Sequence, residues 1–136
     1  KPDKREDVLK ILHPIVKEWF FSKFKDFSLP QRYGILEVHS RNNVLISAPT
    51  GATKTLTAFL SIINELVDSA EKGILEDKIY AVYVSPLRAL NYDIEYNLKQ
   101  PLKEIEELFK KHSKKKQKIR KALYDKFNPG GRLLLL

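Results

Sequence analysis

The sequence NVLISAPTGATKT, residues 43–55, decides the fold of this 136-residue chain. Val44, Leu45 and Ile46 form a continuous apolar run without polar alternation, which is typical of a strand buried on both faces of a parallel sheet. After the loop, apolar residues recur at spacings of three and four, which predicts an amphipathic helix over residues 54–70. These apolar residues are Leu56, Phe59, Leu60, Ile63 and Val67. The predicted order is therefore buried strand, loop, helix.

The loop itself is similar to the GxxxxGKT pattern that binds phosphate between a strand and a helix. In that pattern backbone N–H groups and the helix N-terminus hold the phosphates, a lysine reaches the terminal phosphates and a hydroxyl ligates Mg²⁺. Lys54 and Thr55 would fill the last two roles. The candidate nucleotide-binding residues are Ala48, Pro49, Thr50, Gly51, Ala52, Thr53, Lys54 and Thr55.

Two positions of the loop depart from the pattern. Ala48 stands at the first glycine position and Thr53 at the second. A β-branched residue resists both positive φ and close approach of the backbone to phosphate, so Thr53 leaves open whether the loop binds nucleotide tightly. On the loop alone, an ordinary strand-to-helix turn with a chance lysine is the alternative.

The composition limits the possible function classes. The chain is long enough for one small domain, and it has no cysteine, which excludes disulfides and thiolate metal sites. No stretch reaches the length of a transmembrane span, so we expect no membrane partner and a cytoplasmic location. The net charge of +8 favours an anionic partner, nucleic acid first, although basic charge also serves solubility.

Residues 1–40 are expected to form a helical segment that precedes the phosphate-loop domain. Pro14 predicts the start of a new helix over residues 15–23, and the aromatic stripe with Trp19 and Phe20 indicates core packing. Residues 24–31, FKDFSLPQ, leave that helix and are followed by a short predicted helix over 32–38. Phe24 offers a ring face that can stack on a base, and Gln31 offers a donor and an acceptor to a base edge.

Residues 41–136 are expected to form an incomplete α/β domain. Residues 79–85, IYAVYVS, predict a second buried strand, parallel to the first because a helix connects the two. The loop after it, SPLRAL at residues 85–90, lies where parallel sheets expose ligand-binding loops. Arg88 there could hold the phosphates of a polymer or pair within the loop. A helix over 90–111 with a kink at Pro101 follows, then a lysine-rich segment that is more typical of a solvated face than of a specific contact.

Four stretches, taken together and in this order, carry a resemblance to a known family. They are LHPIVKEWFFSKF, SLPQRYGI, NVLISAPTGATKTLTAFL and YVSPLRALNYDI. They resemble the N-terminal half of the first RecA-like domain of a superfamily 2 helicase, most closely the large-helicase-related (Lhr) family. The resemblance covers about residues 12–105 and implies a partial RecA-like parallel sheet flanked by helices, and a DNA or RNA translocase driven by ATP and Mg²⁺.

The resemblance also implies roles for individual residues. Phe24 resembles the base-stacking aromatic, Gln31 the adenine-reading glutamine, and residues 48–55 motif I, with Lys54 on the phosphates and Thr55 on Mg²⁺. Motif Ia, which holds the nucleic-acid backbone, is matched by Ser85, Pro86, Leu87, Arg88 and Ala89. Residues 128–136, which end in RLLLL, resemble the strand that leads into motif Ib.

Two departures from the family pattern shape the functional expectation. Thr53 replaces the motif I glycine, and the sequence shows no acidic DExH-type motif and no second RecA-like domain. Hydrolysis needs a carboxylate for Mg²⁺ and water and an arginine finger, so we expect no ATP hydrolysis by this chain alone. The alternatives are a non-hydrolysing basic nucleic-acid-binding module and, less favoured, another phosphate-loop enzyme such as a small kinase. Unpaired strand edges also predict self-association.

Overall fold

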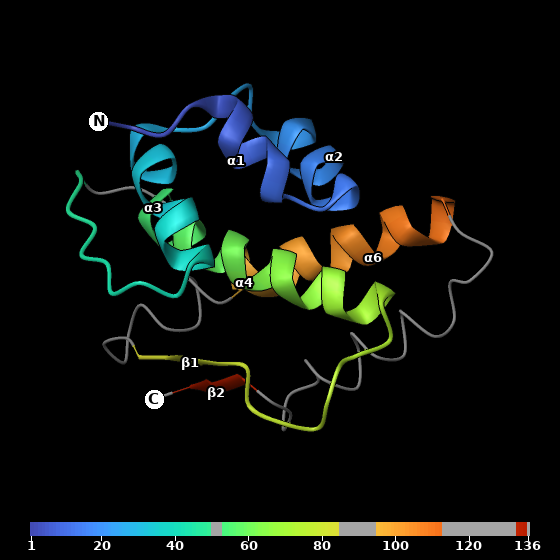
Figure 1. The fold of residues 1–136 in the computed structure, drawn as a ribbon. Helices are drawn as coiled ribbons and strands as arrows, with labels where there is room; N and C mark the ends of the chain where they lie inside the picture. Colours follow the sequence, from blue (N-terminus) through green and yellow to red (C-terminus); the bar gives the residue numbers. More distant parts are fainter. Residues whose placement is uncertain (50–52, 85–94, 113–132, 136) are drawn as a thin grey trace. The chain divides into compact units, whose positions relative to one another are not determined.

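The computed structural model describes residues 1–49, 53–84, 95–112 and 133–135, which are mainly helical (Figure 1). They fall into two compact units, Lys1–Glu65 and Leu66–Leu136. The helices are α1 (Arg5–Ile11), α2 (Pro14–Lys23), α3 (Leu29–His39), α4 (Thr53–Glu71), the π-helix η1 (Glu95–Lys99) and α6 (Gln100–His112). The strands are β1 (Ala81–Tyr83) and β2 (Leu133–Leu135).

The first two helices are separated by a break at Leu12 and His13, as the proline predicts. Pro14 lies in the first turn of α2, where its missing N–H costs nothing, and the Nδ1 atom of His13 accepts a hydrogen bond of 3.2 Å from the Ile15 N–H. The side chain of His13 therefore caps α2. The prediction that Pro14 opens a new helix is confirmed.

Aromatic side chains form the core around α2. Trp19 and Phe20 are buried, which confirms their predicted role in packing. The Phe20 ring stacks on the Phe27 ring at a centroid distance of 4.7 Å and contacts the Phe24 ring at 4.9 Å. These contacts fold the segment after α2 back onto the helix.

Helix α3 begins three residues earlier than the sequence pattern predicts. Its N-cap is Ser28, and Pro30 lies in the first turn, where proline favours helix initiation. The Gln31 Oε1 atom accepts a hydrogen bond of 2.8 Å from the Ser28 N–H, as in a capping box. The expectation that residues 28–31 lie outside the helix is therefore wrong, because these four residues form its capped first turn.

Helix α4 confirms the prediction of an amphipathic helix after the loop. All five predicted apolar positions are buried, and Leu66 and Ala70 join them. Although α4 is the longest described helix, neither it nor another helix in the described ranges has the length and apolar character needed to cross a bilayer.

At Gly34, α3 lies so close to α4 that little space remains for a side chain. A Cβ atom at this position would lie 2.8 Å from the Cγ2 atom of Thr57 and 2.9 Å from the Cδ1 atom of Ile46. Only a residue without a side chain fits this spacing without a shift of a neighbour.

The predicted buried strand over residues 44–46 is not found, which corrects that expectation. Residues 43–48 are irregular, and 38% of Val44 and 96% of Leu45 are exposed. A strand needs the backbone of a neighbouring strand for its N–H and C=O groups, and no other described segment pairs with these residues.

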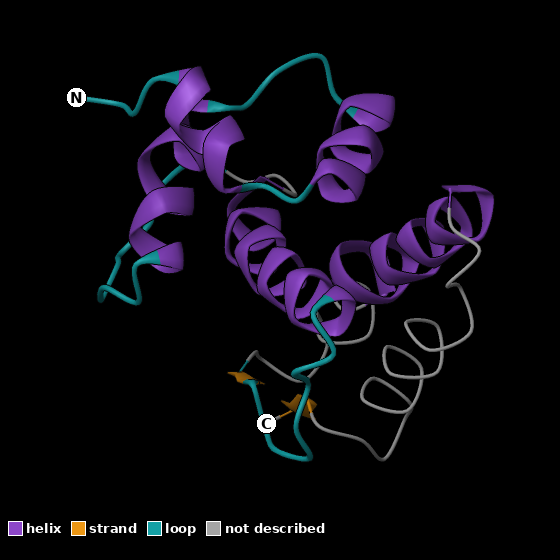
Figure 2. Ribbon diagram, turned by 45° about the vertical axis from the view of Figure 1, so that its right-hand side comes forward, coloured by secondary structure: helices purple, strands orange, loops and turns teal. Residues whose placement is uncertain are grey.

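The described sheet consists of β1 and β2, the two strands drawn in orange in Figure 2. They pair in parallel with Val82 opposite Leu134. The pair confirms a strand within residues 79–85 and a strand in RLLLL. However, β1 is not buried, because 52% of Val82 is exposed, and its described partner is β2 instead of residues 44–46. The predicted partial RecA-like sheet is therefore not confirmed, because the described residues contain only this two-stranded pair.

The helix predicted over residues 90–111 is divided into η1 and α6, while residues 90–94 lie outside the described part. Pro101 cannot donate the N–H that an α-helix would send to the carbonyl of Asn97. The missing donor gives a physical reason for the wider π-helical turn directly before it. The predicted irregularity at Pro101 is confirmed.

We expect Gly34→Val to lower the free energy of unfolding by about 1–3 kcal/mol, because the new side chain overfills the contact with Thr57 and Ile46. Denaturant unfolding followed by circular dichroism would measure the loss. Thr57→Ser removes the contacting Cγ2 atom and keeps the hydroxyl, so it should restore part of the stability in the Gly34→Val background. Strictly additive effects of the two substitutions would contradict the close contact.

Candidate nucleotide site

The phosphate-loop lysine folds back onto its own loop. Lys54 lies in the first turn of α4, and its Nζ atom donates a hydrogen bond of 2.7 Å to the carbonyl oxygen of Ala48. Residues 50–52, at the tip of the loop, lie outside the described residues. The structure thus brings together the two ends of the predicted motif, which are six residues apart in sequence.

Thr53 and Thr55 both belong to α4. Thr53 is its first residue, so its backbone is helical and has a negative φ. Thr55 is partly buried in the first turn. The N-terminus of a 19-residue helix carries unsatisfied N–H groups and a partial positive charge, which suit an anion. The donor set at this end of α4 is therefore a cation, a hydroxyl and backbone N–H groups, and it fits a phosphate group.

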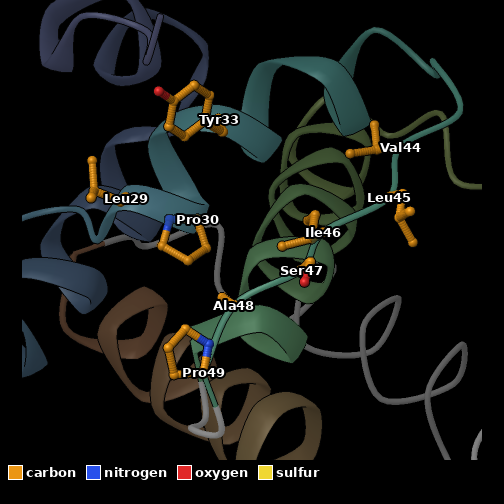
Figure 3. Close-up of a pocket in the computed structure, with 9 residues that line it drawn as sticks. All are labelled: Leu29, Pro30, Tyr33, Val44, Leu45, Ile46, Ser47, Ala48 and Pro49. Atoms are coloured by element: carbon orange, nitrogen blue, oxygen red, sulfur yellow. The ribbon is translucent and has the colours of Figure 1, made fainter.

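An open groove of about 600 Å³ lies beside the loop (Figure 3). One wall comes from the first part of α3 and the other from the irregular segment before the loop, ending at Ala48 and Pro49. Its lining is mostly apolar and consists of Leu29, Pro30, Tyr33, Val44, Leu45, Ile46, Ser47, Ala48 and Pro49. Half of Tyr33 is exposed, so its ring is accessible to a planar ligand.

The two predicted base-contacting residues lie in different environments. Phe24 follows the last residue of α2 and is 37% exposed, so part of its ring face is available for stacking. Gln31 is only 2% exposed, and its Oε1 atom is used by the Ser28 N–H. Neither residue lines the groove. Gln31 therefore has a structural role as a helix cap, and its contact with a base stays a prediction.

For the other predicted site residues, the structure provides no distances or contacts. Ser85, Pro86, Leu87, Arg88 and Ala89, the predicted nucleic-acid contacts, lie outside the described residues. Within the described ranges no three His, Asp or Glu side chains come together as a metal-binding group.

Sequence reasoning missed a row of buried polar residues on α4. Thr57, Ser61 and Asn64 are at most 4% exposed and follow one another at spacings of four and three residues. The Ser61 Oγ atom donates a hydrogen bond of 3.2 Å to the Ile35 carbonyl of α3. The signal was present in the sequence, since three small polar residues share one stripe beside the apolar face of the helix.

Comparison with known proteins identifies one family for most of the chain. The DEAD/DEAH box helicase family matches residues 28–129, which include α3, the phosphate loop and α4. No solved structure gave a significant match.

The similar curated proteins are helicases. The chain is 57% identical over 103 residues to the ATP-dependent helicase Lhr-Core protein 2 of Thermococcus barophilus, and these residues are 76% of this chain and 12% of that protein. It is 54% identical over 118 residues to ATP-dependent helicase Lhr-Core of Methanocaldococcus jannaschii, which covers 87% of this chain and 14% of that protein. The Lhr helicase/uracil glycosylase of Escherichia coli is 31% identical over 108 residues. The resemblance to the Lhr family is confirmed, and the chain spans about an eighth of the length of the two archaeal relatives.

We expect Gln31→Met to lower the free energy of unfolding by about 1–2 kcal/mol, because it leaves the Ser28 N–H without its acceptor at the start of α3. Gln100→Met is the matched control, since Gln100 is exposed and its bond to Glu104 joins two surface side chains. The control should change stability by less than about 0.5 kcal/mol. Equal effects of the two substitutions, measured by denaturant unfolding, would contradict the capping role.

Proposed function

Because the chain belongs to the DEAD/DEAH box helicase family, we propose that it supplies the nucleotide site of an ATP-dependent helicase. The observation that carries the proposal is the bond from the Lys54 Nζ atom to the Ala48 carbonyl. An ammonium group held at the loop by the Ala48 carbonyl can exchange that partner for phosphate oxygens, which are the stronger acceptors. The free chain thus keeps the lysine close to the position from which it would bind phosphate.

Thr55 is proposed to ligate the Mg²⁺ that accompanies ATP. Its hydroxyl lies one residue after Lys54 at the N-terminus of α4, which is the order that a phosphate loop requires. The bound Mg²⁺ would neutralise phosphate charge, and this chain would contribute the hydroxyl, the ammonium group and the helix N–H groups. Hydrolysis and movement along nucleic acid are proposed for full-length helicases such as the two archaeal relatives, and not for this chain alone.

Phe24 and Gln31 are proposed to recognise the base. Phe24 offers an exposed ring face, and the bond between Gln31 Oε1 and the Ser28 N–H fixes the plane of the carboxamide. The Nε2 amino group carries the remaining donors of the carboxamide, and because Gln31 is only 2% exposed, its donation to adenine requires the first turn of α3 to shift when the base binds. The exposed ring of Tyr33 in the neighbouring groove is a second surface on which a planar group can pack.

Residues 85–89 are proposed to hold the nucleic-acid backbone. They follow β1 in the sequence and include Arg88, whose guanidinium group can bind a phosphate in a bidentate manner. The net charge of +8 favours association with a polyanion of either kind, DNA or RNA.

We expect Lys54→Ala to weaken binding of Mg²⁺-ATP at least about tenfold, because it removes the charged partner of the phosphates. Thr53→Gly should strengthen binding, because it removes a β-branched side chain at the start of α4, where the backbone would approach phosphate. Isothermal titration calorimetry on the native chain and both variants would test this, with Lys72→Ala as a control for loss of one exposed lysine that pairs with Asp68. Unchanged affinity in Lys54→Ala would overturn the assignment, and binding only in Thr53→Gly would show that the native loop is closed to nucleotide.

Nucleic-acid binding should weaken steeply with salt, because bound lysine and arginine side chains release counterions from the phosphates. Arg88→Ala is expected to reduce the slope of log K against log salt by about one unit. Fluorescence anisotropy with labelled single-stranded DNA and RNA of equal length would measure both quantities. Lys78→Ala, which removes a cation paired with Glu76, is the control, and an equal change of slope in that variant would argue against a specific contact at Arg88.

A further inference from the structure

Asn64, in the middle of α4, occupies the break between α1 and α2. Its Nδ2 atom donates a hydrogen bond of 2.9 Å to the carbonyl of Ile11, the last residue of α1, and its Oδ1 atom accepts one of 2.6 Å from the N–H of His13, the N-cap of α2. Asn64 is only 3% exposed. Both backbone groups lack helical partners because the helix is interrupted there. A single carboxamide therefore satisfies the two partly buried polar groups that the break leaves.

Ser61 makes the corresponding connection to α3, one turn closer to the phosphate loop. Its Oγ atom donates to the Ile35 carbonyl, and both residues are buried. Gly34, next to Ile35, allows the close approach to Thr57, which lies one turn before Ser61 in α4. The polar contacts thus link α4 to α3 and to the break between α1 and α2, all within residues 1–65.

Polar and apolar contacts constrain a helix differently. Apolar side chains fill volume but tolerate small rotations and shifts along the axis, whereas buried hydrogen bonds have a narrow range of length and angle and are costly to break. An α-helix is stiff and rises about 1.5 Å per residue, so a shift at Asn64 is transmitted to Lys54, about 15 Å away. The bonds of Asn64 and Ser61 therefore fix where the first turn of α4 lies relative to α3.

We propose that Asn64 and Ser61 are positioning residues that hold α4 in the register needed for nucleotide binding, with the N-terminal helices as their anchor. The inference rests on the proposed function, because its consequence for binding passes through Lys54 and Thr55. In the described part of the chain, the hydrogen bonds of Asn64 and Ser61 go to the N-terminal helices and the break between them, not to the loop. Their effect is on the placement of the helix that carries both phosphate-loop residues.

Three variants in the 136-residue chain test the proposal at graded severity. Asn64→Leu removes both bonds, Asn64→Asp keeps the acceptor for the His13 N–H but places an acceptor against the Ile11 carbonyl, and Ser61→Ala removes one donor. Ser61→Ala is the variant that should fold without difficulty, because the Ile35 carbonyl keeps its own helical bond in α3. Glu65→Gln is the control, because Glu65 is the next residue of α4 and pairs at the surface with Arg41.

Two measurements distinguish an effect on the placement of α4 from a general loss of stability. Affinity for Mg²⁺-ATP is measured by calorimetry well below the unfolding temperature, and hydrogen exchange is measured in the second turn of α4, residues 57–60, whose N–H groups are the first with helical acceptors. We expect the Asn64 variants to bind roughly tenfold more weakly, Ser61→Ala to shift in the same direction by less, and exchange in the second turn to rise in all three but not in Glu65→Gln.

Unchanged affinity in the folded Asn64→Asp and Ser61→Ala variants would overturn the proposal, even if their stability falls. If the native chain itself binds no nucleotide, the proposed function has failed, and hydrogen exchange then decides alone. Faster exchange in the second turn of α4 in the variants would still support positioning of that helix, and unchanged exchange would overturn it.

Discussion

The close contact of α3 with α4 at Gly34 is the constraint on which the arrangement of the candidate site depends. The absence of a side chain there brings the backbone of α3 near Thr57, and the Ser61 bond to the Ile35 carbonyl locks the contact one turn along. Gln31 lies one turn before Gly34, and Lys54 lies one turn before Thr57. The proposed base-reading and phosphate-binding residues are thus both placed by one contact between two helices.

A second constraint concerns the strands, whose polar groups must find partners outside their own segment. The α-helices satisfy most of their backbone groups internally, and they form wherever local sequence, caps and an apolar stripe agree. Residues 44–46 have the apolar character of a buried strand, yet they are irregular and Leu45 is almost fully exposed. The pairing of β1 with β2 is limited to three residues in the same way, because in the described part of the chain each strand has only the other as a partner.

These two constraints explain how much of the molecule could be predicted from the sequence. The start of α2 at Pro14 and the apolar face of α4 follow from local chemistry and are confirmed. The early start of α3 was missed, although the Ser28 and Gln31 spacing is that of a capping box. The burial of Val44 was predicted wrongly because burial of a strand depends on distant segments, which periodicity does not reveal.

In the candidate site, too, some residues could be predicted from a local motif and others could not. The motif spacing predicts that Lys54 serves the loop, and its bond to the Ala48 carbonyl brings both ends of the loop together. The motif says nothing of Asn64, because a family pattern records the residues around a ligand and not those that hold their helix. A phosphate loop supplies chemistry only if the helix behind it is fixed, and that requirement is met here by carbonyl and N–H groups of the N-terminal helices. The N-terminal helices α1 to α3 therefore help to hold the helix that carries Lys54 and Thr55 in place.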